Sequence, residues 1–394
     1  MMAAGALMAA GNQGNLTSFE EMDPQGATGE TRETTSFPLI SPMVPEHLNP
    51  YADSVCPSDI FELLLPDGKR FGMFSDPYAT IEYHEPKYGL PNGRFWLDMH
   101  MQGADISQKE LRLVDVLSTT RTMTRRQLER VIFPGMHPQD RAGVEFIKKC
   151  RSRGIICAYR WASPLKDDRR KPLAYMLTKA GADAAEILFH RKLNDEYWAR
   201  PVEYGAGQGP EMTPYFVDLA INELHAELVR IDRLTDWQRR PVIRVDQQTF
   251  HIPAASFEMI RDRNDFLQFW IEVFRPGPEF IHRTAQRFSR LRQVYLKLPE
   301  HKRPARVFLI ADGDSRIPLL SRIAEQYMPE VPLRFTTDER LIAQLGRDTF
   351  LEYNNIEKKM TASTMKFLQE NAAGMKASEY FSEARRHDDD EFED

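Results

Sequence analysis

Cysteine is scarce in this sequence of 394 residues, which contains only Cys56, Cys150 and Cys157. An odd number of cysteines without the paired spacing of a metal site argues against a disulfide framework and against a zinc site. We therefore expect no metal and no cofactor, and a reducing cytoplasm is the simplest compartment for the chain.

The sequence also lacks a long apolar run. No stretch approaches the roughly 18 apolar residues that a membrane-spanning helix needs. Residues 1–15, MMAAGALMAAGNQGN, have no basic segment and too short an apolar stretch for a secretory signal. These features predict a cytoplasmic protein without a membrane partner.

Positive charge is in deficit over the whole chain, with a net charge of −6, but its distribution is uneven. Residues 1–60 hold eight acids and one base, and residues 377–394 hold eight acids and two bases. Residues 107–200 hold twenty bases and eleven acids. Because an anionic polymer responds to local charge, the basic centre is compatible with nucleic acid binding.

The two ends of the chain differ from its middle in composition. Residues 1–55 are rich in Gly, Ser, Thr, Pro and Glu and show no apolar periodicity, which predicts a disordered arm. Residues 346–394 read as a helical segment followed by the acidic tail HDDDEFED, which we also expect to be disordered. Short apolar runs separated by turn residues predict a small β-rich lead-in over residues 56–100, and the sequence indicates no function for it.

Two helix-start signatures and a third helix occupy the basic region. Ser107-x-x-Glu110 and Thr124-x-x-Gln127 each precede an apolar run, as in a capping box. A third helix is predicted over residues 138–153, with Gly154 just past its end. Strand-like runs then flank a basic loop, and another helix follows. Three short helices before a hairpin predict a winged helix-turn-helix domain over residues 105–200.

The predicted winged helix offers three sets of basic and polar side chains to DNA. Residues at the start of its second helix would contact phosphate, residues on its third helix would enter the major groove, and residues in the wing would contact the backbone or the minor groove. The expected DNA-binding residues are Arg125, Arg126, Gln139, Arg141, Lys148, Lys149, Arg169, Arg170 and Lys171. The alternative is a winged helix that only binds proteins, so that the chain is an adaptor.

A second pattern follows the Gly/Pro-rich linker at residues 201–212. An amphipathic helix, three strand-like runs (residues 241–246, 249–260 and 266–274), a long helix and a buried strand succeed one another. This is the αβββαβ order of restriction-endonuclease-like domains, which we expect over residues 213–345. The whole chain is therefore predicted to be α+β.

A nuclease site in such a domain needs carboxylates on neighbouring strands and a lysine that orients or activates water. Glu272 is the candidate carboxylate, but Phe274 stands at the lysine position, and Ala254 follows Pro253 where a second acid is expected. The pattern predicts a non-catalytic domain, in which Glu272 pairs with Arg275 or a helix residue. A divergent metal-dependent nuclease using Glu272 and Asp246 remains the enzymatic alternative.

Three further groups have both a functional and an ordinary structural interpretation. His225 shares a helix face with Asp218 and Asn222, either as a binding face or as an interfacial histidine. Asp312-Gly313-Asp314 follows a buried strand, where α/β folds place sites, but is also an ordinary turn. The long helix carries arginines outside its apolar stripe, which either extend a DNA footprint, bind a partner or are solvated; these are Arg283, Arg287, Arg290 and Arg292.

Residues 107 to about 328 resemble the plasmid replication-relaxation family of bacterial mobile elements. The resemblance lies in ISQKELRLVDVLSTTRTMTRRQLERVIFP, FIKKCRSRGIICAYRW, YMLTKAGADA, FVDLAINELHAELV, HIPAASFEM, FWIEVFRPGPEF and ARVFLIAD. It implies a winged-helix domain before an endonuclease-like one, and a role in plasmid replication, DNA relaxation or mobilisation. The family's usual Pro-Asp is Pro253-Ala254 in this chain, and its Glu-Val-Asp-Arg-Gly is the segment 272–276, Glu-Val-Phe-Arg-Pro.

The sequence thus predicts a DNA-binding protein of a plasmid or integrative element that recognises double-stranded DNA through a winged helix. Replication or conjugation proteins are its expected partners. A homodimer would fit repeated half-sites, and the sequence leaves dimerisation open. A transcriptional repressor is the principal alternative function, because it would use the same helix.

Overall fold

The computed structural model forms an α+β fold with mixed sheets. It describes residues 72–84, 93–103, 106–135, 140–163, 170–200, 202–205, 207–263, 265–275, 280–343, 345, 349–368 and 374–383. The expected arm at residues 1–55 and the acidic tail HDDDEFED at residues 387–394 lie outside these ranges. In this described part of the chain, no helix is both long enough and apolar enough to span a membrane.

The first two helices of the N-terminal unit begin as the sequence predicts. α3 (Gln108–Thr120) has Ser107 as its N-cap, and α4 (Arg125–Ile132) has Thr124. Both capping boxes are formed: the amide of Gln127, for example, donates to Thr124 Oγ1 at 3.3 Å, and Gln127 Oε1 accepts from the Thr124 amide at 2.8 Å. The capping signatures therefore predict both helix starts to the residue.

The third helix is shorter than predicted. α5 spans Ala142–Ser152 rather than residues 138–153, and residues 136–139 are outside the described part of the chain. Its end is as expected, because Gly154 adopts a φ of +72°, which a glycine reaches without strain.

An antiparallel sheet follows α5 in the order β1-β3-β4-β2. Its strands are β1 (Thr80–His84), β3 (Ile156–Ala162), β4 (Ala174–Leu177) and β2 (Met123–Thr124). The predicted hairpin β3–β4 is confirmed, and residues 164–169 between these strands are outside the described ranges. α6 (Lys179–Phe189) closes the unit.

The lead-in is only partly β-structure. β1 pairs with β3 and so extends the sheet of the N-terminal unit. Residues 93–99 (GRFWLDM), a strand-like run of the predicted lead-in, instead belong to helix α2 (Gly93–Met101). Trp96 and Leu97 are buried there with α6, because adjacent apolar residues can share the inner side of a helix but point to opposite faces of a strand.

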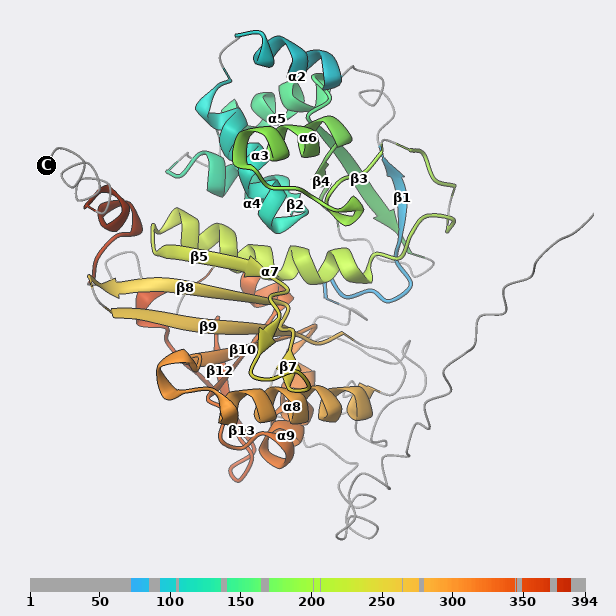
Figure 1. The fold of residues 1–394 in the computed structure, drawn as a ribbon. Coiled ribbons are helices and arrows are strands. Elements are labelled where there is room, and N and C mark those ends of the chain that lie inside the picture. Colours follow the sequence, from blue (N-terminus) through green and yellow to red (C-terminus); the bar gives the residue numbers. More distant parts are fainter. Residues whose placement is uncertain are drawn as a thin grey trace, which may run out of the picture.

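The next helix, α7 (Thr213–Arg230), lies between the N-terminal unit and a large sheet (Figure 1). The sequence predicts an amphipathic helix with one apolar face, but residues 218–228 are all buried. The reason is that α7 is covered on two sides: α4 and β2 pack on one, and strands of the large sheet on the other. Its polar residues face protein rather than water.

Seven strands form the large sheet, in the order β13-β12-β11-β10-β9-β8-β5. β5, β8 and β9 are antiparallel, β9, β10 and β11 are parallel, and β12 and β13 close the sheet as an antiparallel hairpin. The bounds are β5 Leu234–Arg239, β8 Ala255–Asp262, β9 Asp265–Val273, β10 Arg306–Ala311, β11 Leu333–Thr337, β12 Leu351–Asn354 and β13 Lys359–Ala362.

Two strand predictions are wrong: residues 241–246 form no strand of the large sheet, and residues 249–260 are divided between a short ribbon strand and β8. The first strand of the sheet is 234–239, which the sequence does not predict because its alternation is broken by polar residues. Most of 241–246 instead leads into a separate two-stranded ribbon, β6 (Ile243–Arg244) with β7 (Phe250–His251). The helical segment predicted from residue 346 is wrong over residues 351–362, which form the β12–β13 hairpin, and the short helix α10 (Asp338–Ala343) comes before it.

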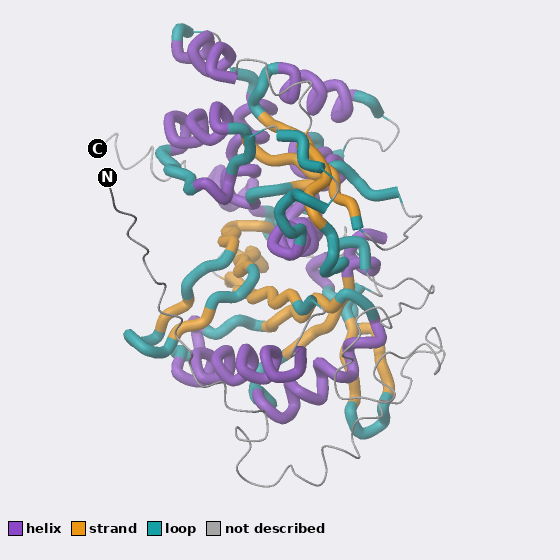
Figure 2. Tube along the Cα trace, turned by 90° about the vertical axis from the view of Figure 1, so that its right-hand side faces the viewer, coloured by secondary structure: helices purple, strands orange, loops and turns teal. Residues whose placement is uncertain are grey.

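Helices cover both faces of the large sheet (Figure 2). α7 lies on one face, and α8 (Phe280–Lys297) and α9 (Ile317–Tyr327) lie on the other. The side chains of β10 alternate accordingly: Phe308 and Ile310 join the core beneath α7, whereas Val307 and Leu309 pack with α8 and α9. Short 3-10 turns lie at Asp195–Tyr197, Glu300–Lys302, Asp314–Arg316 and Lys366–Leu368, and residues 377–383 are helical.

Candidate nucleic-acid interface

One side of α5 is exposed and carries basic residues. Arg141, Lys148 and Lys149 are exposed, whereas Gly143, Ile147 and Cys150 on the opposite side are buried. This division follows the helical period, because residues three to four positions apart share a face. Glu145 also lies on the exposed side, so the face is basic but not uniformly so.

Arg125 and Arg126 are exposed at the start of α4, directly after the Thr124 cap. Arg125 Nε lies 3.5 Å from Oε1 of the half-buried Glu129 in the next turn, and a pair of this kind on a helix surface contributes little to stability. Both guanidinium groups are therefore accessible to an anionic partner.

The predicted wing residues are only partly within the described chain. Arg170 is exposed and Lys171 half-buried, just before β4. Gln139 and Arg169 fall in undescribed segments, so their predicted roles remain predictions.

A further basic residue of the third helix has a structural partner. The sequence suggests that Arg153 points outward with the lysines, but its guanidinium forms an ion pair with Glu110 of α3. Glu110 is also the acid of the first capping box, and its Oε2 accepts from the Ser107 amide at 3.2 Å. Although burial raises its pKa, Ser107 and Arg153 hold the pKa of Glu110 below its ordinary value. This pair orients the end of α5 against α3.

α4 presents its other side to α7. Gln127 Nε2 donates to the Leu219 carbonyl and to Glu223 Oε1, each at 2.8 Å, and Arg130 forms an ion pair with Glu223. A capping-box glutamine thus also joins the two units. Sequence analysis missed this contact because it links residues more than ninety positions apart.

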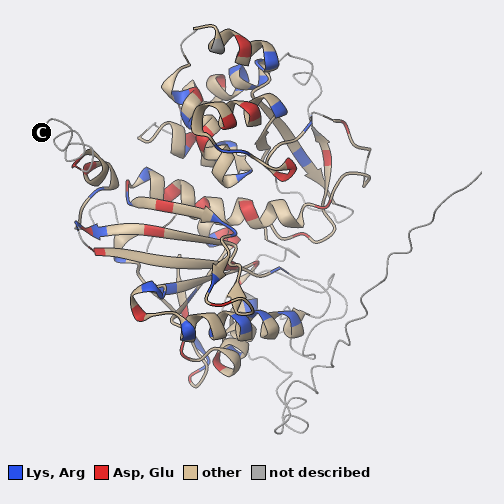
Figure 3. Cartoon of the chain, in the orientation of Figure 1, with Lys and Arg blue, Asp and Glu red and all other residues tan. Residues whose placement is uncertain are grey.

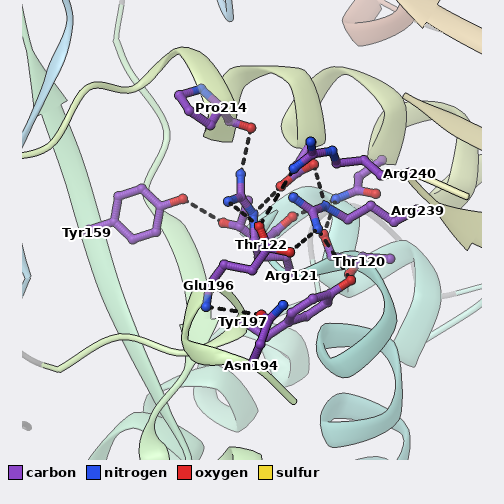
Figure 4. A network of polar contacts seen from close by, with 12 residues as sticks. Thr120, Arg121, Thr122, Tyr159, Asn194, Glu196, Tyr197, Pro214, Arg239 and Arg240 are labelled. Carbon is purple, nitrogen blue, oxygen red and sulfur yellow. Dashed lines mark hydrogen bonds and ion pairs between the residues drawn. The ribbon is translucent and has the colours of Figure 1, made fainter. Parts of the chain in front are cut away.

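A buried charged network lies where the two units meet (Figure 4). Arg121, at the end of α3, forms an ion pair with Asp218 of α7, and its Nη2 donates to the Pro214 carbonyl at 2.6 Å. Arg239 of β5 donates to the other oxygen of Asp218 at 2.7 Å. Arg239 also contacts Glu196, with a nitrogen–oxygen distance of 3.2 Å.

Asp218 in this network has 1% of its surface exposed and lies between two cations. Burial raises its pKa, and Arg121 and Arg239 oppose that rise. Asn222, one turn later, donates to the Thr122 carbonyl at 2.6 Å. The helix face that the sequence offers as a binding face is therefore occupied by the N-terminal unit.

His225 on the same helix is buried beside Trp237, with ring centroids 4.8 Å apart in an edge-on arrangement. Burial lowers its pKa to about 3, and Arg112 adds to the effect. The interfacial interpretation of this histidine describes its surroundings correctly.

Glu272, the candidate nuclease carboxylate, is completely buried. Its Oε1 lies 2.6 Å from His251 Nε2, and its other oxygen forms an ion pair with Arg287 of α8. Burial alone would raise its pKa, but Arg287 and His251 hold it below the ordinary value. Phe274 packs in the core, and Asp246 is exposed and bound by Lys297 at 2.9 Å. Glu272 thus pairs with a helix residue, one of the two partners expected for it.

The carboxyl ends of the parallel strands carry a second set of paired acids. Asp312 forms an ion pair with Arg316, Asp314 pairs with Arg340 at 2.6 Å, and Arg275 pairs with Asp338 at 2.9 Å. Burial and Asp312 raise the pKa of Asp338 to about 6, against the effect of Arg275. These carboxylates have structural counter-charges.

Within the described residues, no group of three or more His, Cys, Asp or Glu side chains could hold a metal ion. Cys150 and Cys157 are free and buried, and burial raises the pKa of each thiol to about 12. The buried acids are already paired, whereas the cations of α4 and α5 are exposed, so these cations are the groups best placed to meet an anionic partner.

Comparison with known proteins identifies no relative of this chain, because no protein-family model, no curated protein and no solved structure matches it.

Proposed function

We propose that residues 105–200 form a winged helix-turn-helix that binds double-stranded DNA, with α5 in the major groove. The observation that carries the proposal is the exposed basic side of α5, with Arg141, Lys148 and Lys149, on a helix whose other side is buried. Two capped helices precede α5 and a β-hairpin follows it, which is the element order of that domain.

Each basic group has a distinct role in this proposal. Arg125 and Arg126 bind phosphates beside the major groove and set the orientation of the protein. Arg141 is suited to a base edge because a guanidinium makes paired hydrogen bonds to guanine, whereas Lys148 and Lys149 supply salt-sensitive attraction to phosphate. Arg170 and Lys171, with Arg169 and Gln139, complete the predicted contact set.

We further propose that the second unit is an endonuclease-like domain that serves assembly or partner contacts rather than cleavage. The order α7, β5, β8, β9, α8, β10 supports the αβββαβ interpretation. The partners of Glu272 support the non-catalytic role, because Arg287 and His251 already contact the two oxygens of the carboxylate. On the family resemblance, the DNA site lies on a plasmid or integrative element and the protein acts in its replication, relaxation or mobilisation.

The test is a selection of bound duplexes from a random DNA pool with the full chain at about 100 mM salt, a concentration at which phosphate contacts are already weakened. We expect an enriched motif, and Arg141→Ala should weaken binding to that motif by about 1–3 kcal/mol while random duplexes lose less. Retention of no duplex, even at lower salt, would refute the proposal and favour the adaptor alternative.

A further inference from the structure

The β6–β7 ribbon exposes apolar side chains. Its register pairs Ile243 with His251 and Arg244 with Phe250. Side chains alternate along a strand, so Ile243 and His251 face the protein, where Ile243 packs on the core and His251 is buried. Arg244 and Phe250 face outward.

The outward side of the ribbon is not the polar surface that a half-buried antiparallel pair usually presents to water. Val242 is 56% exposed, Phe250 42% and Ile252 38%. The Arg244 guanidinium lies 5.9 Å from the centre of the Phe250 ring. An aromatic ring, two aliphatic side chains and a cation therefore share one exposed surface.

α8 packs beside this ribbon and carries several Lys and Arg residues along its length (Figure 3). Arg287 forms an ion pair with Glu272. Arg292 forms one with Glu330, with an Arg292 Nη2–Glu330 Oε1 distance of 2.5 Å. Arg283 and Arg290 are exposed and have no counter-charge within the described residues. They precede and follow Arg287 by four and three positions, and so lie on the same side of the helix.

Two contacts hold the ribbon along α8. At one end, Lys297 Nζ lies 2.9 Å from Asp246 Oδ2 and 2.7 Å from Thr249 Oγ1. Further along, Glu272 bridges His251 of the ribbon and Arg287 of the helix. Arg283 and Arg290 share the side of α8 that carries Arg287 and Lys297, and this is the side that holds the ribbon. We group them with the exposed outer residues of the ribbon as the ribbon surface: Val242, Arg244, Phe250, Ile252, Arg283 and Arg290.

We propose that the ribbon surface binds single-stranded DNA. Unpaired bases stack on an exposed aromatic ring and cover aliphatic side chains, while a row of cations follows the phosphates; this combination is typical of single-strand binding. A duplex hides its base faces, so it could use the arginines but not Phe250. The surface lies at the opposite end of the molecule from α5 (Figures 1 and 2), and is separate from the proposed duplex site.

The experiment measures binding of the full-length protein to a fluorescent 20-nucleotide oligo-dT by anisotropy, from low to moderate salt. We expect Arg283→Ala with Arg290→Ala to weaken binding at least tenfold, and to reduce the salt slope by about 1.4, or 0.7 for each lost phosphate contact. Phe250→Leu keeps an apolar side chain but removes the ring. It should weaken binding about fivefold or more without changing the slope.

Arg292→Ala is the matched control, because it removes one arginine from the same helix at a position already paired with Glu330. It should leave oligo-dT binding nearly unchanged. Lys148→Gln with Lys149→Gln should reduce binding to duplex DNA and spare oligo-dT, so that failure of one proposal can be told from failure of the other.

Three results would overturn the proposal. The first is oligo-dT binding that the paired Arg283 and Arg290 substitutions do not affect. The second is equal loss in the Arg292→Ala control. The third is displacement of oligo-dT by a blunt duplex of the same length at equal concentration, which would assign the surface to duplex DNA.

Discussion

At the residue scale, the buried carboxylates Glu272 and Asp338 both have basic partners. Glu272 is held by His251 and Arg287, and Asp338 by Arg275. His225 is the contrasting case, because it packs against the ring of Trp237 and burial lowers its pKa to about 3. A histidine that is uncharged in the folded protein makes stability depend on pH.

The expected pH dependence has a definite sign. Below pH 6.5 the unfolded chain protonates this histidine and the native state does not, so the free energy of unfolding falls by up to about 1.4 kcal/mol per pH unit, until about pH 3. His225→Phe should remove this contribution, which amounts to about 2 kcal/mol between pH 7 and pH 5. Urea unfolding at several pH values measures it.

His301→Phe is the matched control, because His301 is exposed. Asp338 works in the opposite direction: its raised pKa of about 6 means that its contribution falls as the pH rises from about 4 to 6. All of these proteins keep Asp338, so its contribution cancels when the pH dependence of the free energy of unfolding is compared between them. If the free energy of unfolding falls equally steeply with decreasing pH in His225→Phe and in the parent protein, the conclusion that His225 is neutral in the native state is wrong.

At the element scale, the features that the sequence predicts are those with local causes. Capping boxes lie within four residues, so the starts of α3 and α4 follow from Ser107 and Thr124. The hairpin β3–β4 and the buried strand β10 also follow from their own apolar patterns.

The features that the sequence does not predict depend on distant contacts. β5 is an edge strand in which Asp236 and Gln238 are exposed and Arg239 meets Asp218 at the charged junction, so its sequence lacks the apolar alternation of a strand. The polar residues of α7 have the pattern of a helix face exposed to solvent, but they are buried because they contact other parts of the protein. Of the candidate interface, the exposed positions on α4 and α5 could be predicted, whereas the pairing of Arg153 with Glu110 could not.

Gly181 provides an element-scale prediction that runs against helix propensity. In an exposed helix, replacing glycine by alanine stabilises the folded protein by roughly 0.5–1 kcal/mol. A Cβ at Gly181, however, would lie 2.4 Å from the Ile155 carbonyl oxygen, which also accepts from the Thr178 amide at 3.0 Å. That oxygen cannot retreat without losing the bond that anchors α6.

We therefore expect Gly181→Ala to lower the free energy of unfolding by about 1–3 kcal/mol, as overpacking does. Equilibrium urea unfolding, followed by circular dichroism, gives the difference directly. A variant that is more stable than the parent protein would show that α6 can move away from Ile155, and would contradict the close packing of this helix against β3.

At the scale of the whole molecule, α7 belongs to both units. One side of it contributes to the core above the large sheet, and the other side meets Arg121, Gln127 and Arg130 of the N-terminal unit. The linker at residues 201–212 suggests two independent domains. The buried network instead predicts that the two units unfold together.

Asp218→Asn tests this coupling. It keeps the side-chain shape but leaves Arg121 and Arg239 buried without their shared anion, which should cost about 3–5 kcal/mol. Asp183→Asn removes the helical partner of the exposed Lys179 and should cost less than about 1 kcal/mol. The measurement is urea unfolding with probes in both units. A large loss confined to one unit, or equal effects of the two substitutions, would contradict the junction's proposed role.

The most direct test of the duplex-binding proposal is the salt dependence of binding to a random-sequence duplex. Lys148→Gln with Lys149→Gln changes an exposed adjacent pair on α5, and Lys358→Gln with Lys359→Gln makes the same charge change at an exposed pair in the β12–β13 hairpin. We predict that the α5 pair lowers affinity and reduces the slope of log K against log salt by up to about 1.8, or 0.9 for each phosphate contact, whereas the hairpin pair changes neither. Equal effects of the two substitutions would mean that only net charge matters, and would contradict the assignment of α5 as the DNA-binding helix.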